Sequence, residues 1–170
     1  LVPVLLGMCV FHLVSGHCAA ARELAEQCVR LSDEAGAIDY HIESTAVLTF
    51  ALCYLGELEA SSEMANKSLA LYRSRHGGEF VPITAQNPGV AVLETQAIVL
   101  WQLGYADQSL QCIADALELA EELAQPIDFV QIYTHSAELH QLRGEPEKAM
   151  EQANKGIQIA AKHGYDYWQL

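Results

Sequence analysis

The chain has 170 residues, 51% of them hydrophobic and 18% charged, and its formal net charge is −13. This apolar content is enough for the core of one domain. Because a surface with this excess of acidic groups repels phosphate backbones, we expect no direct nucleic-acid binding. Residues 1–14 are apolar but too few to span a bilayer, and they lack the basic start of a signal peptide. We therefore predict a cytoplasmic chain without membrane contact.

Four glycines, at positions 16, 56, 104 and 144, divide the chain into similar units with spacings of 40, 48 and 40 residues. Each glycine separates two helical runs, and Pro88 and Pro126 stand where the first turn of a helix tolerates proline. In chain order, the predicted helices span 2–15, 18–34, 38–55, 57–74, 88–103, 106–124, 126–143 and 145–163.

These helices form four predicted repeats, at about 1–36, 37–75, 88–125 and 126–164. A loop at 76–87 accounts for the longer second spacing, and 165–170 begin a fifth, truncated repeat. We expect a single solenoid that is a piece of a longer array, with apolar end faces that favour homo-association.

Small side chains recur at fixed distances from the turn glycines, where two helices must approach closely. Seven residues before each glycine stand Cys9, Thr49, Ala97 and Ala137; five after, Ala21, Ser61, Ser109 and Ala149; twelve after, Cys28, Ser68, Ala116 and Gly156. The five cysteines are odd in number and two of them, Cys9 and Cys28, stand at such positions, so we expect free buried thiols in a reducing compartment.

This pattern resembles the tetratricopeptide (TPR) repeat, although the period is near 40 rather than about 34 residues. The resemblance implies an all-α fold, a right-handed superhelix of antiparallel helix hairpins. Four phrases of the sequence narrow the resemblance to one subgroup of TPR proteins. They are FHLVSGH (11–17), YLGELEAS (54–61), NPGVAVLETQAIVLWQLGYADQSL (87–110) and LHQLRGEPEKAMEQAN (139–154).

These phrases are similar to the C-terminal TPR region of bacterial signalling proteins that join a class III cyclase or a kinase domain to a STAND-type ATPase. The repeat array of the maltose-regulon activator is a more distant likeness. The resemblance implies a sensor and regulatory arm, with nucleotide chemistry elsewhere. The sequence has neither a GxxxxGK[ST] loop nor a cyclase aspartate pair, so we expect no enzyme and no cofactor.

The first helix of each repeat should line the concave face of such a stack. The positions of these helices relative to the turn glycines select the candidate binding residues. They are Glu43, Phe50, Tyr54, Glu94, Ile98, Trp101, Gln102, Gln131, Glu138 and Gln141. Aromatic, aliphatic and acidic groups together suit an amphipathic or basic peptide, and the Lys, Arg and Asn of carboxylate-clamping TPRs are missing. The alternative is that Phe50 and Trp101 pack between repeats.

Other clusters favour structural interpretations. Asp115, Glu118 and Glu122 form one stripe of a helix, either a solvated face or a contact for a basic partner. Cys9, His12, His17 and Cys18 fall within ten residues, but His12 and His140 share one repeat position, which indicates packing rather than a metal site.

Two other functions are alternatives to peptide binding. One is a small-molecule sensor with a pocket between the 76–87 loop and repeats two and three. The other is a self-association arm.

Overall fold

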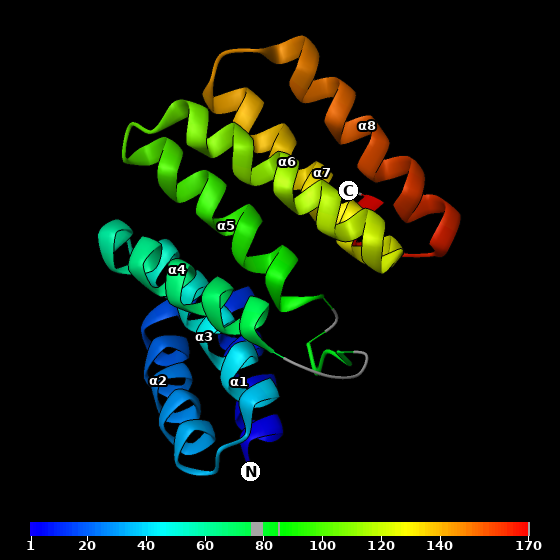
Figure 1. Ribbon diagram of the computed structural model, residues 1–170. Helices are drawn as coiled ribbons and strands as arrows, with labels where there is room; N and C mark the ends of the chain where they lie inside the picture. The colour runs from blue at the N-terminus through cyan, green and yellow to red at the C-terminus, as the bar shows by residue number, and fades with distance from the viewer. Residues whose placement is uncertain (76–79, 85, 170) are drawn as a thin grey trace.

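The computed structural model describes residues 1–75, 80–84 and 86–169. Within them, eight α-helices form antiparallel pairs and no strand occurs, which confirms the predicted all-α fold of repeated hairpins (Figure 1). The helices are α1 (Val2–Val14), α2 (Cys18–Glu34), α3 (Ile38–Tyr54), α4 (Leu58–Ser74), α5 (Pro88–Gln102), α6 (Ala106–Leu123), α7 (Pro126–Leu142) and α8 (Pro146–His163).

Every predicted helix end lies within one residue of the observed one. After α8, residues 166–169 form a short 3-10 helix, η1 (Asp166–Gln169), at the place where the sequence predicts the first turns of a fifth repeat. No helix in the described part of the chain is both long and apolar enough to cross a membrane. All five cysteines are free.

The helices form two layers. The first helices of the pairs (α1, α3, α5 and α7, the inner helices) pack side by side, each against the next. The second helices (α2, α4, α6 and α8, the outer helices) cover them, and each packs against its own inner helix. Stacking in chain order leaves α1 and α8 at opposite ends of the molecule (Figure 1).

Gly104 shows how each hairpin turns. Its φ of 90° lies in the left-handed region, which lets its N–H donate to Trp101 O (3.0 Å) while the N–H of Tyr105 donates to Leu100 O (2.8 Å). These bonds pair the last carbonyls of α5 in the manner of a Schellman motif. The same two bonds recur at the other three turn glycines, which explains their regular spacing.

The small residues allow the paired helices to touch. The Ser61 hydroxyl donates to Thr49 O (2.9 Å), and Ser109, at the equivalent position, donates to Ala97 O (2.7 Å). All four residues are buried. In the last pair, a Cβ added to Gly156 would lie 3.4 Å from Tyr133 Cβ, so the helices approach closely there as well.

Replacement of Gly104 by alanine should lower the free energy of unfolding by about 1–2 kcal/mol, because an L side chain is strained at this φ. An added Cβ would meet no atom within 4 Å, so the cost comes from the backbone alone. Thermal melting followed by circular dichroism measures the change.

Gly7 provides the matched control, because it lies inside α1 and its Cβ position is also open. Gly7→Ala should raise stability by about 0.5–1 kcal/mol. Equal effects of the two substitutions would contradict this account of the turn.

Candidate functional site

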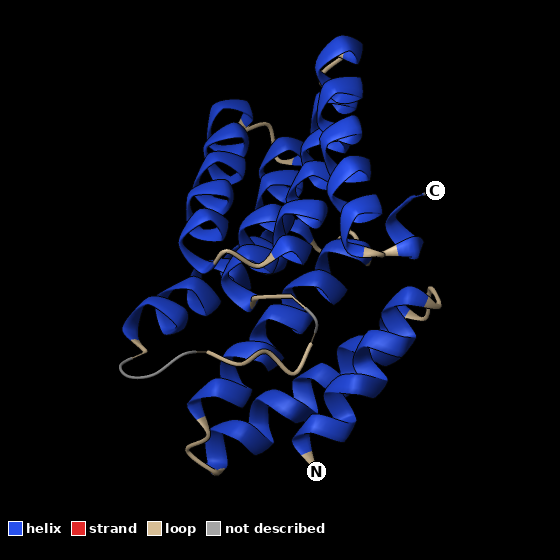
Figure 2. Cartoon of the chain, turned by 90° about the vertical axis from the view of Figure 1, so that its right-hand side faces the viewer, coloured by secondary structure: helices blue, strands red, loops and turns tan. Residues whose placement is uncertain are grey.

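Between α4 and α5, residues 80–84, 86 and 87 are non-helical, and we call them the anchored segment. In Figure 2 the described parts of this connection, drawn in tan, cross the middle of the molecule. Two residues of the anchored segment bind one carboxylate of α3. The N–H of Ile83 donates to Glu43 Oε1 (2.6 Å), and the Thr84 hydroxyl donates to Oε2 of the same side chain (2.8 Å).

Two further carboxylates hold the end of this segment. Gln86 Nε2 donates to Glu94 Oε1 on α5 (2.8 Å), and the N–H of Asn87 donates to Asp128 Oδ1 on α7 (3.0 Å). Asn87 also caps α5, since its Oδ1 accepts from the N–H of Gly89 (2.9 Å). Three successive inner helices therefore each contribute one buried carboxylate to the same stretch of polypeptide.

Burial and hydrogen bonding shape the charge of this site. Burial raises the pKa of Glu43 despite the bonds from Thr84 and Ile83, and burial raises the pKa of Asp128 to about 6. Burial alone would lower the pKa of His135, but the Glu94 carboxylate 3.5 Å away raises it to about 9. The Glu94 carboxylate is thus the main group that favours the protonated form of His135.

The C-terminal halves of the inner helices carry a second group of residues. The rings of Phe50 and Tyr54 stack with centroids 6.4 Å apart, and Tyr54 is 63% exposed. Burial, and next the charge of Glu138 on α7, raise the pKa of the Cys53 thiol to about 11. The Arg143 guanidinium lies 5.3 Å from the ring centroid of Trp101.

The ten residues selected from the sequence therefore divide by depth. Ile98, Glu43 and Glu94 are buried, the first in the hydrophobic core and the two acids beneath the anchored segment. Phe50, Trp101 and Gln131 are half-buried, and Trp101 also packs against the core. Tyr54, Gln102, Glu138 and Gln141 are exposed. We call Phe50, Tyr54, Trp101, Gln102, Glu138 and Gln141 the aromatic–acidic surface.

Sequence reasoning missed Asp128, His135 and Arg143. Asp128 lies in the first turn of α7, where an acidic residue is ordinary helix-start composition. His135 and Arg143 fall outside the register positions chosen for the concave face. Only the fold brings them to Glu94 and Trp101.

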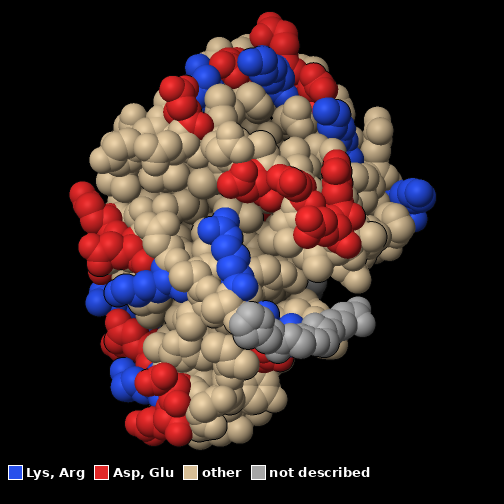
Figure 3. Space-filling model, in the orientation of Figure 1, with Lys and Arg blue, Asp and Glu red and all other residues tan. Residues whose placement is uncertain are grey.

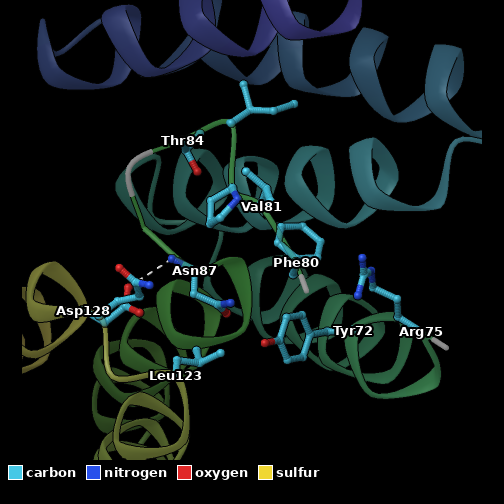
Figure 4. Close-up of a pocket in the computed structure, with 11 residues that line it drawn as sticks. Tyr72, Arg75, Phe80, Val81, Thr84, Asn87, Leu123 and Asp128 are labelled. Carbon is cyan, nitrogen blue, oxygen red and sulfur yellow. Dashed lines mark hydrogen bonds between the residues drawn. The ribbon is translucent and has the colours of Figure 1, made fainter. Parts of the chain in front are cut away.

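A pocket of about 640 Å³ lies beside the anchored segment, between α4 and the start of α7. Figure 4 shows Tyr72 and Phe80 in its middle, with Arg75 toward one end and Asp128 toward the other. The Tyr72 and Phe80 rings are 6.1 Å apart, and the Arg75 guanidinium stacks 4.9 Å from Phe80. The lining mixes polar, aromatic and aliphatic side chains. His76 to Glu79, part of the predicted loop, lie outside the described residues.

The remaining clusters show no built site. Acidic side chains gather over α6 (Figure 3), where Asp115 accepts a hydrogen bond from Gln111 and Glu118 and Glu122 are exposed. Cys9 is buried in the core and His140 bonds Glu145 (2.7 Å), whereas His12 Nδ1 is buried without a hydrogen-bond partner among the described residues. Across the described residues, no three His, Cys, Asp or Glu side chains are grouped to hold a metal ion.

No protein-family model matches this sequence, and no curated protein matches it either. Among solved structures, the fold is similar to BtubC (BKLC) from P. vanneervenii, a helical-repeat protein, with a TM-score of 0.67 at 15% sequence identity. The match covers 96% of this chain but only 65% of that one. This similarity shows a helical-repeat fold and nothing finer.

Asp128→Asn should change how stability depends on pH. The pKa of Asp128 is near 6 in the folded state, above the unfolded value of 3.8. Between these two pH values the native state binds more protons than the unfolded state, so Asp128 makes stability fall as the pH rises. The variant keeps an oxygen acceptor for Asn87 but cannot ionise. It should gain on the order of 1–3 kcal/mol over wild type between pH 4 and pH 6. Urea unfolding at several pH values measures this, and parallel profiles would contradict it.

Proposed function

We propose that this chain is a protein-interaction module whose inner helices bind a peptide segment of a partner. The observation that carries the proposal is the anchored segment, which is a non-helical stretch of polypeptide already held on this layer. Two of its backbone N–H groups, those of Ile83 and Asn87, donate to carboxylates on α3 and α7. The surface therefore has groups that hold a peptide main chain, in addition to side-chain contacts.

The partner segment would occupy the aromatic–acidic surface, which continues along the same helices beyond the anchored segment. The stacked pair of Phe50 and Tyr54 offers an apolar platform, and Glu138 offers an exposed charge. A basic, amphipathic peptide fits such a surface, and the net charge of −13 would speed its approach.

We also propose that this module acts as part of a larger protein. The phrases at 87–110 and 139–154 support a regulatory arm of a larger cytoplasmic ATPase in signalling or transcription control. In that setting, peptide binding across several inner helices would be transmitted by small rotations between neighbouring hairpins.

A small-molecule effector is the second candidate, and the pocket between Tyr72, Phe80 and Asp128 favours it. Asp128 Oδ2 is buried with no hydrogen-bond partner among the described residues, so a ligand amine reaching it would satisfy a carboxylate oxygen. Thermal stabilisation by small amines, lost in Asp128→Asn, would favour this function over peptide binding.

The peptide proposal is tested with a fluorescent peptide of alternating leucine and lysine, followed by anisotropy. Trp101→Ala should weaken its binding about tenfold, since truncating a central aromatic commonly costs more than 1 kcal/mol. Glu138→Lys should weaken it as well, and a leucine–glutamate peptide should bind less tightly than the basic one.

Tyr167→Ala is the matched control, because Tyr167 is an exposed aromatic on η1, away from the aromatic–acidic surface. Its binding should equal wild type, and all variants should keep their helicity. Indistinguishable affinities of wild type, Trp101→Ala and Glu138→Lys would refute the proposal. A large loss of thermal stability in Trp101→Ala would assign that residue to packing between repeats.

A further inference from the structure

One oxygen of the Asp128 carboxylate lacks a donor. Oδ1 accepts from the N–H of Asn87 (3.0 Å), whereas Oδ2 is buried with no hydrogen-bond partner among the described residues. The side chain is fully buried, and burial raises its pKa to about 6. A buried carboxylate oxygen without a donor costs free energy. A bound group that brings both a proton to donate and a positive charge to Oδ2 would recover this cost.

Aromatic and aliphatic side chains line the pocket beside this oxygen. Tyr72 comes from the end of α4, Phe80 from the anchored segment and Leu123 from the end of α6. All three are half-buried, so each still offers apolar surface to a ligand. In Figure 4 the rings of Tyr72 and Phe80 lie between Asp128 and Arg75. The pocket therefore suits an organic cation with an aromatic body rather than a bare ion.

The charges around the pocket restrict that cation further. Asp128 is the only acid among the described residues that line it, whereas a divalent metal ion needs several oxygen ligands. At the far end lies the Arg75 guanidinium, which is paired with Asp39 and stacked 4.9 Å from the Phe80 ring. A second positive charge on the ligand would be repelled by Arg75, and a carboxylate beside its amine would be repelled by Asp128. The ligand is therefore a monocation without an acidic group.

We propose that this pocket binds an aryl-alkyl ammonium ion, that is, a primary amine carrying one aromatic ring. Its ammonium group would donate to Asp128 Oδ2, and its ring would lie against Tyr72 and Phe80. The inference rests on the second candidate function, the small-molecule effector, and names the ligand class for it; it does not depend on peptide binding. Because Oδ1 of the same carboxylate holds Asn87, the ligand would join α4, the anchored segment and α7 at one point.

An NMR titration of the amide resonances with phenethylamine tests the proposal. Wild type should bind it, with the largest shifts near Asn87 and Leu123. Phenethyl alcohol keeps the ring without the charge, butylamine keeps the charge without the ring, and phenylalanine adds a carboxylate beside the amine. Each of these three should bind about tenfold more weakly or worse, because each loses a charge-assisted hydrogen bond or an apolar contact, or gains a repulsion.

Two variants separate the two parts of the site. Asp128→Asn keeps an acceptor for Asn87 but loses the charge, so phenethylamine should bind about tenfold more weakly. Phe80→Leu keeps an apolar side chain but loses the ring, so it should weaken the binding of phenethylamine and leave that of butylamine unchanged.

Asp107→Asn is the matched control, because Asp107 is also an acid in the first turn of a helix, α6, but is exposed. Its affinity for phenethylamine should equal that of wild type. Equal affinities of wild type and Asp128→Asn would overturn the proposal. Butylamine that binds as tightly as phenethylamine would refute the aryl class and leave an amine effector standing. If no amine binds while the leucine–lysine peptide still does, the ligand site fails and the peptide function stands.

Discussion

The architecture depends on the close approach of the two helices in each pair. At Ser61 and Ser109 a hydroxyl reaches the carbonyl of the facing helix directly, which requires the two backbones to be almost in contact. A longer side chain at either position would separate the helices and open voids beside them. The contact recurs at the same position in the second and third repeats, and small residues, Ala21 and Ala149, stand there in the other two. The inner helices are thereby brought side by side, and the surface they form follows from that placement.

Buried charge is the second constraint on this surface. An ionised carboxylate inside a protein is costly unless it is hydrogen-bonded or paired. Glu43 accepts from the anchored segment, Glu94 meets both Gln86 and His135, and Asp128 accepts from Asn87. The segment and the acids therefore satisfy each other, and hydrogen bonds to α3, α5 and α7 help to fix the path of the segment.

The sequence predicts the helices well because their signal is local and repeated: turn glycines, small residues at constant offsets, and Pro88 and Pro126 at helix starts. It predicts the site less well. Glu43 and Glu94 fall on the concave register and so suggest an exposed acidic lining, yet both are buried, because a non-repeating connection covers them. The bonds that tie it to Glu43 and Asp128 join residues 40 and 41 positions apart, with no periodic pattern to reveal them.

A stack of helical hairpins can behave as a spring, since neighbouring repeats slide and rotate slightly without losing their cores. Here the anchored segment is hydrogen-bonded to α3, α5 and α7, which belong to three consecutive repeats. Extension or twisting across those repeats would have to break its bonds to buried carboxylates. These helices belong to the second, third and fourth repeats, so the segment ties together the two junctions among them, and the junction between the first and second repeats carries none of its bonds.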